Sequence, residues 1–310
     1  MKAALDAVRA RVDLRARRDA DPIAFVHRQT TRADRELVAL LAASCALGNV
    51  KAIRMKLEEA LERIGPSVGR AADDPEELHA RLRGFKHRLF KGEDIARLLV
   101  GARRVQRARG TLGKAFEREL ARVDRERPGD DSEARFREAL ASFCDRIREE
   151  GGLPAPGTRD PSGRRGPAHL LSDARAGSAA KRLLLFLRWM IRPDDGIDLG
   201  MWSVSPERLL VPVDVHIHKL ARNLGLTKRP DLSWKTCVEI TRALRRYDAD
   251  DPIRYDFSLC HMGMVQKCPS KRDAKRCEGC GVRPVCVHWD RGAPGPRAGA
   301  GPRRRLPRQD

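Results

Sequence analysis

The sequence predicts an all-α protein, and three observations support this fold class. Charged residues make up 34% of the chain and aromatic residues only 5%, which favours well-solvated helices over a sheet sandwich. Apolar residues recur at spacings of three and four in nearly every segment that has a regular pattern. No segment shows the sustained alternation of apolar and polar residues that is typical of strands.

The N-terminal half, residues 1–150, has several helix signals in succession. Thr31 and Asp34 resemble a capping box, and Gly48 closes the helix that follows. Further helices are predicted over 93–109 and 112–123. Two more are indicated by apolar stripes, at Ile53, Leu57, Leu61 and Ile64 and at Phe136, Leu140, Phe143 and Ile147. We therefore predict an N-terminal helical region over 1–150.

The remainder of the chain divides at segments of unusual composition. Residues 151–167 are rich in Gly, Pro and Arg, and we expect a flexible linker or loop there. The region 168–267 contains an apolar helix over 177–192, a helix capped by Ser233, and a helix opened by Asp251 and Pro252. A four-cysteine segment follows over 268–289, and we predict a disordered basic tail over 290–310.

The charge balance indicates a polyanionic partner. The chain carries 63 Lys and Arg against 43 Asp and Glu, a net charge of +20 that is not confined to its ends. Nucleic acid is the simplest such partner, and a bias in base composition is the alternative. No stretch is apolar enough to span a membrane, so we expect no membrane partner. The charged amphipathic N-terminus is not a signal peptide, and we expect a monomeric cytoplasmic protein whose cysteines are reduced or metal-bound.

The cysteines give the strongest signal for a cofactor. Cys268, Cys277, Cys280 and Cys286 have the spacing C-x8-C-x2-C-x5-C. Four thiolates in so short a segment can surround one metal centre, either a [4Fe–4S] cluster or Zn. The single C-x2-C with uneven outer spacing favours the cluster, because zinc sites often pair two such knuckles. The other four cysteines, Cys45, Cys144, Cys237 and Cys260, are interpreted as core residues.

Two groups of basic residues are candidates for contact with nucleic acid. One lies between the first two cysteines of the segment and consists of Lys271, Arg272, Lys275 and Arg276. The other, Lys86, His87 and Arg88, follows an aromatic residue in the N-terminal half. A merely solvated basic surface is the alternative for each group.

The stretch VPVDVHIHKLARNLGL over 211–226 carries the main catalytic candidate, Asp214. Asp214 is well placed to cap the helix that follows, and this role alone would explain it. However, the whole arrangement of an apolar run, the VDxH pattern, further helices and a four-cysteine loop resembles the helix-hairpin-helix DNA glycosylases related to endonuclease III. Stretches such as GFKHR, KRLLLFLRWM and DLGMW resemble an uncharacterised bacterial branch of that superfamily.

The resemblance implies two helical lobes with a cleft between them and a C-terminal iron–sulfur loop. It implies that Asp214 stabilises positive charge on the sugar during base release, and that Lys181 forms a Schiff base in a lyase step. It also implies that the turn at Gly177 grips a DNA phosphate, with Arg175 and Arg182 beside it. The family's paired glycines are absent from this turn.

The expected function is therefore DNA binding with N-glycosylase activity on a damaged or modified base. Two alternatives from other classes remain open at this point. One is a non-catalytic iron–sulfur protein that binds DNA or RNA. The other is a structural protein stabilised by zinc.

Overall fold

The computed structural model describes residues 1–289, and the predicted basic tail over 290–310 lies outside them. Helix accounts for 57% of the structure and strand for 2%, with fourteen α-helices in the described part. The prediction of an all-α protein is therefore confirmed. Within residues 1–289, no helix is both long enough and apolar enough to cross a membrane.

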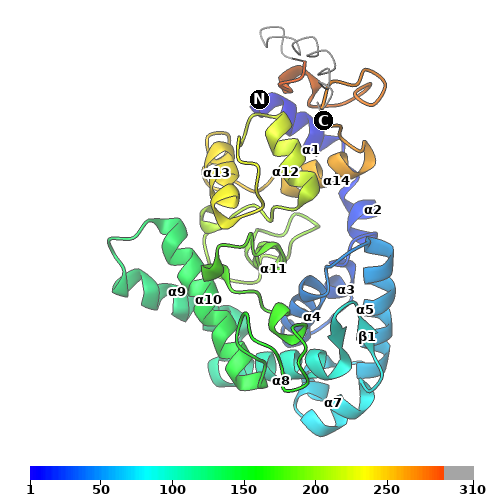
Figure 1. The fold of residues 1–310 in the computed structure, drawn as a ribbon, viewed down its shortest axis with the longest axis vertical. Coiled ribbons are helices and arrows are strands. Elements are labelled where there is room, and N and C mark those ends of the chain that lie inside the picture. Colours follow the sequence, from blue (N-terminus) through cyan, green and yellow to red (C-terminus); the bar gives the residue numbers. More distant parts are fainter. Residues whose placement is uncertain (290–310) are drawn as a thin grey trace, which may run out of the picture.

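The N-terminal helices begin at the end of the molecule that also holds the cysteine segment (Figure 1). There α1 packs on α14, and α2 then leads the chain toward the opposite end. The predicted start at Thr31 is confirmed, because its side chain accepts a hydrogen bond from the backbone N–H of Asp34. The elements are α1 (Lys2–Ala10), α2 (Leu14–Asp19), α3 (Ala24–His27), α4 (Arg32–Ser44), α5 (Val50–Ile64), α6 (Val68–Ala72) and α7 (Pro75–Arg81).

A small hairpin interrupts the helices where the sequence indicates no strand. Here β1 (Lys86–His87) pairs antiparallel with β2 (Phe90–Lys91). The turn between the two strands places Arg88 at a positive φ of 56°, and Gly84 just before the hairpin has a φ of 78°. Both strands have only two residues, so no alternating pattern could mark them in the sequence.

Three long helices follow: α8 (Gly92–Arg109), α9 (Leu112–Glu126) and α10 (Ser132–Gly151). Helix α8 lies toward the end of the molecule opposite α1, and α9 projects from one side (Figure 1). The axes of α8 and α10 approach closely because glycines stand at the crossing. A Cβ added at Gly101 would lie 2.2 Å from the carbonyl oxygen of Ile147, and one at Gly151 would lie 2.2 Å from that of Arg97. The predicted helices in this region are confirmed.

The segment 151–167 is irregular, as its Gly and Pro content predicts, but it is not a free linker. Arg164 extends from it to bond Asp94 at the N-terminus of α8, with N–O distances of 2.9 and 3.0 Å. Arg164 also pairs with Glu93 and with the buried Asp160 of the same segment. This ion-pair network holds the segment against α8. Such a long-range anchor leaves no sign in local composition.

The C-terminal half contains α11 (Lys181–Ile191), α12 (Val215–Asn223), α13 (Trp234–Arg245) and α14 (Asp256–Val265). Single 3-10 turns lie at η1 (Pro167–His169), η2 (Ala174–Ala176), η3 (Pro206–Arg208) and η4 (Arg283–Val285). The cap at Ser233 is confirmed, since its hydroxyl accepts a hydrogen bond from the Thr236 N–H.

Two of the predicted helix starts are wrong. The helix expected from residue 177 begins at Lys181, because Gly177 and Ala180 both have positive φ and Ser178 pairs with Ser233 as a β-bridge. The helix expected from Asp251 begins at Asp256. The Asp251 carboxylate accepts hydrogen bonds from Arg192 at 2.9–3.0 Å, so it is not available as a cap.

One hydrophobic core runs through the molecule from Leu5 in α1 to Val282 in the cysteine segment. The apolar helix α11 lies near the middle of the molecule and packs on α4 (Figure 1). Cys45, Cys144 and Cys237 are buried in this core as predicted, and Cys260 packs against it while partly exposed.

Candidate functional site

Asp214 stands at the N-terminus of α12 and uses its two carboxylate oxygens differently. Oδ1 accepts hydrogen bonds from the backbone N–H groups of His216 and Ile217, both at 2.9 Å. Oδ2 lies 3.6 Å from Nζ of Lys181, the first residue of α11. The side chain of Asp214 is 21% exposed and that of Lys181 is 34% exposed. The fold therefore brings both predicted catalytic residues together at a half-buried surface where two helices begin.

A turn at Gly177 precedes α11, whose first residue, Lys181, faces Asp214. Gly177, with a φ of 81°, accepts a hydrogen bond through its carbonyl from the Trp234 N–H at 3.0 Å. The turn is thereby tied to the beginning of α13. The space where a Gly177 side chain would project holds no atom within 4 Å. A phosphate could therefore approach this backbone closely, although the residues that precede it form only the single 3-10 turn η2.

Helix α14 packs against α12, and its buried Asp256 and its Cys260 lie near Asp214. Burial raises the pKa of the Asp256 carboxyl, an effect that the positive charge of Arg188 opposes. Burial also raises the pKa of the Cys260 thiol, and the negative charges of Asp214 and Asp256 add to this rise. Cys260 is therefore a protonated core thiol and not a nucleophile.

The four cysteines of the metal-binding prediction lie in the segment that follows α14. Cys277 and Cys286 are buried, and Cys268 and Cys280 are partly exposed. Burial raises the pKa of the Cys268 and Cys286 thiols, and repulsion among the four sulfurs adds to the rise. The segment thus folds so that its four thiols share one neighbourhood.

The spacing of the sulfurs bears on which metal centre they fit. Four thiolates bound to one zinc at about 2.3 Å lie about 3.8 Å from one another. In the described part of the chain, no three cysteine sulfurs lie within 4.8 Å of one another. The sulfurs are thus not gathered as they would be around a bound zinc ion, and four thiols are a donor set that suits either zinc or a [4Fe–4S] cluster.

The predicted basic residues of this segment are all exposed. Lys271, Arg272, Lys275 and Arg276 face solvent. The Arg272 guanidinium lies 4.2 Å from the ring centre of Trp289, and Arg276 pairs with Asp273 at 3.6 Å. Lys271, Arg272 and Lys275 have no ion-pair partner in the part of the chain that the structure describes.

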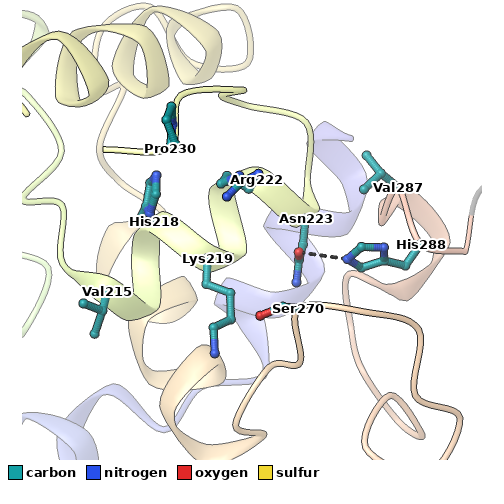
Figure 2. A pocket seen from close by; sticks show the side chains of 9 residues that line it. All are labelled: Val215, His218, Lys219, Arg222, Asn223, Pro230, Ser270, Val287 and His288. Atoms are coloured by element: carbon teal, nitrogen blue, oxygen red, sulfur yellow. Dashed lines mark hydrogen bonds between the residues drawn. The ribbon is translucent and has the colours of Figure 1, made fainter. Parts of the chain in front are cut away.

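A groove that the sequence did not indicate lies between α12 and the cysteine segment (Figure 2). We call it the α12 groove, and its volume is about 530 Å³. No carboxylate lines it, and two exposed cations, Lys219 and Arg222, do. His218 also lines it. The remaining lining residues are Val215, Asn223, Pro230, Ser270, Val287 and His288.

The groove carries positive charge that is not neutralised by neighbours. Among residues 1–289, neither Lys219 nor Arg222 forms an ion pair. Residues 218, 219 and 222 recur at helical spacing on one face of α12, so this wall alone could have been found from the sequence. The opposite wall, however, comes from residues 270, 287 and 288, and only the folded chain brings them there.

Two predicted phosphate contacts are corrected by the structure. The Arg175 guanidinium is held by Glu138 and Asp145, with its closest N–O distances at 2.7 Å, so its charge is already neutralised. Arg182 donates to the backbone carbonyls of Ser44 and His169 and lies over the ring of Phe90. Both arginines join elements of the fold, and neither is a free cation beside Gly177.

The predicted basic group of Lys86, His87 and Arg88 is corrected in part. His87 is buried, and its Nε2 lies 2.9 Å from the backbone oxygen of Cys45, so it cannot contact a ligand. Lys86 and Arg88 are exposed. They belong to the hairpin region at the opposite end of the molecule from α12 (Figure 1). They therefore do not extend the α12 groove.

A family model with the description "Protein of unknown function (DUF2400)" matches residues 21–265. The match includes Lys181 and Asp214, and it ends before the four cysteines. No curated protein and no solved structure matches the chain.

Proposed function

The chain belongs to the DUF2400 family, and we propose that it binds DNA and releases a damaged or modified base by cleaving the N-glycosidic bond. The observation that carries this proposal is the distance of 3.6 Å between Lys181 Nζ and Asp214 Oδ2. An amine and a carboxylate at this distance, partly exposed beside an open backbone turn, match the two roles that the resemblance to helix-hairpin-helix glycosylases implies.

The Asp214 carboxylate supplies electrostatic stabilisation. Breaking the bond between C1′ and the base develops positive charge on the sugar, and a fixed carboxylate beside C1′ lowers the energy of that state. The two backbone N–H groups on Oδ1 hold the carboxylate in place, while Oδ2 remains directed at Lys181. A carboxylate held in this way needs little reorganisation during the reaction.

Lys181 adds the nucleophilic step. As the free amine, Nζ attacks C1′ while the C1′–base bond breaks, and the departing base takes the bonding electron pair and a proton. Opening of the sugar ring then converts the C1′–N bond into a Schiff base. The target base has to leave the helical stack first, because its glycosidic bond is shielded in the duplex.

The α12 groove and the cysteine segment support DNA as the ligand. Lys219 and Arg222 line a surface without carboxylates, and Lys271, Arg272 and Lys275 continue the positive charge across the segment. Such a surface binds phosphates with a strong dependence on salt. The four cysteines fit a [4Fe–4S] cluster, which would hold this segment rigid. When bound, such a cluster would supply either structural support or redox chemistry.

A second candidate function is a non-catalytic iron–sulfur protein that binds nucleic acid. It is favoured by the way in which Asp214 is used, because one oxygen caps a helix and the other already faces a cation. In this case the pair would only join α11 to α12. The same groove would bind DNA or RNA.

The test is base release from a panel of lesion-containing duplexes, with borohydride trapping of any Schiff base. We expect Lys181→Ala to abolish trapping and Asp214→Asn to abolish base release, while both variants keep their affinity for plain duplex. Lys235→Ala changes a lysine in the first turn of α13, and Asp74→Asn changes the cap of α7; both serve as matched controls. Binding without base release by the wild-type protein on every lesion would support the second candidate.

A further inference from the structure

Asn223, the last residue of α12, contacts both ends of the cysteine segment. Its Nδ2 donates to Sγ of Cys268 at 3.2 Å and to the backbone oxygen of Pro269 at 2.8 Å. Its Oδ1 accepts from Nε2 of His288 at 3.0 Å, and its backbone oxygen accepts from the Val287 N–H at 2.8 Å. One buried side chain thus joins the start and the end of the segment (Figure 2).

These contacts require an amide at this position. Only the side chains of Asn and Gln carry an NH₂ group with two donor hydrogens and an acceptor oxygen on the same carbon. Gln is longer by one methylene, which would move its amide group away from the positions that these four contacts fix. Aspartate has the shape of asparagine, but it would direct an acceptor at the Cys268 sulfur and the Pro269 carbonyl, where donors are needed.

Asn223 also forms part of the wall of the α12 groove, between Arg222 and His288 (Figure 2). The helix that ends at Asn223 begins directly after Asp214. The side of the groove formed by residues 287 and 288 is therefore held to this helix by the Asn223 side chain and backbone. Any displacement of the cysteine segment would open the groove.

We propose that Asn223 is a positioning residue for the metal centre. Its amide group donates a hydrogen bond to the thiolate of Cys268 and holds the cysteine segment against α12. This inference rests on the proposed metal centre. Hydrogen bonds to ligand sulfurs stabilise the thiolate and tune the potential of a cluster. Loss of the bond weakens the hold on the metal, and the groove then loses affinity for DNA.

The experiment compares the full-length wild-type protein with Asn223→Asp, Asn223→Ala and His288→Ala after anaerobic reconstitution with iron and sulfide. Iron and sulfide per chain, the rate of iron release to a chelator, and the reduction potential are measured. We expect iron release to be about 10–100-fold faster in Asn223→Asp and Asn223→Ala, as for other residues that support metal ligands. His288→Ala keeps the bond to Cys268 and is expected to release iron at nearly the wild-type rate.

The reduction potential separates this role from a general loss of stability. Asn223→Asp retains the acceptor for His288 but loses the donor to sulfur and adds a negative charge, so we expect its potential to be lower than that of the wild type. The matched control is Asn49→Ala, which removes the exposed cap of α5. Plain duplex DNA serves as the probe for the groove, and the Asn223 variants should bind it more weakly.

Two negative outcomes are distinguishable. A wild-type protein that holds neither iron nor sulfide after reconstitution would overturn the metal centre of the proposed function, and this inference with it. A wild-type protein that holds a cluster, with an unchanged potential and unchanged iron release in Asn223→Asp, would overturn the role of Asn223 alone. A variant that fails to fold would show reduced helicity, and Asn223→Ser, which keeps a small hydroxyl donor, then serves for the same comparison.

Discussion

Lys181 and Asp214 lie within 3.6 Å of each other across the first turns of two different helices. Lys181 is the first residue of α11, and Asp214 is the cap that directly precedes α12, so only the folded chain brings the two together. Because one Asp214 oxygen caps α12 and the other faces Lys181, the structural and the proposed chemical roles of this carboxylate can be separated by substitution.

The capping role of Asp214 predicts different stabilities for two variants. Asp214→Ala removes the acceptor for the His216 and Ile217 N–H groups, and we expect the free energy of unfolding to fall by about 1 kcal/mol. Asp214→Asn keeps an acceptor of the same shape and should cost far less. Urea denaturation of both variants checks this. Equal losses in the two variants would mean that the negative charge, and not the cap, stabilises the helix.

The α12 groove predicts a change in the salt dependence of DNA binding. Removing both Lys219 and Arg222 by substitution with Ala should lower the log–log slope of affinity against salt by about 1.8, or about 0.9 for each phosphate contact. The measurement is titration of a labelled duplex at several salt concentrations. Lys114→Ala with Arg118→Ala removes the same charge from α9, away from the groove, and should leave the slope unchanged.

The crossing of α8 and α10 predicts a strong effect of a single methyl group. In Gly101→Ala the new Cβ would lie 2.2 Å from the Ile147 carbonyl oxygen, so the helices must separate. We expect a loss of about 1–3 kcal/mol or more in the free energy of unfolding, measured by denaturation. Gly129→Ala, where no atom lies within 4 Å, should change the stability little. A stable Gly101→Ala variant would contradict the close approach of the helices.

The lowered pKa of His261 in the folded protein leads us to expect a loss of stability in acid. Burial lowers the pKa of His261 to about 4, and the charges of Arg17 and Arg188 add to this effect. The unfolded chain, with the ordinary value of 6.5, therefore binds the proton first as pH falls. Stability is fully present above pH 6.5 and decreases between pH 6.5 and about 4.

Comparison with His261→Gln isolates this contribution. The variant cannot titrate at this position, so its free energy of unfolding should fall less steeply across the same pH window, by up to one bound proton. His87, whose pKa is also lowered by burial, is present in both proteins and cancels in the difference. Parallel pH profiles for the two proteins would show that His261 titrates normally in the folded state.

Several features of this protein could be predicted from the sequence because they depend on local interactions. Thr31, Ser233 and Asp214 cap their helices through hydrogen bonds to residues two or three positions later, so the signal and its effect lie in the same short segment. The local pattern also predicted helices over 93–109 and 112–123, where α8 and α9 lie, and the apolar stripe from Phe136 to Ile147 indicated α10 without fixing its ends. The four cysteines were recognisable for the same reason.

The use of each charge was decided only by the tertiary structure. The sequence alone gives no reason why Arg175 should be neutralised by Glu138, or why Lys219 and Arg222 should remain without an acidic neighbour in the described part of the chain. The late starts of α11 and α14 have the same origin, because the bridge from Ser178 to Ser233 and the pairing of Arg192 with Asp251 join distant segments. A local pattern determines which residues can form a helix, whereas long-range packing determines which polar groups remain free to bind a ligand.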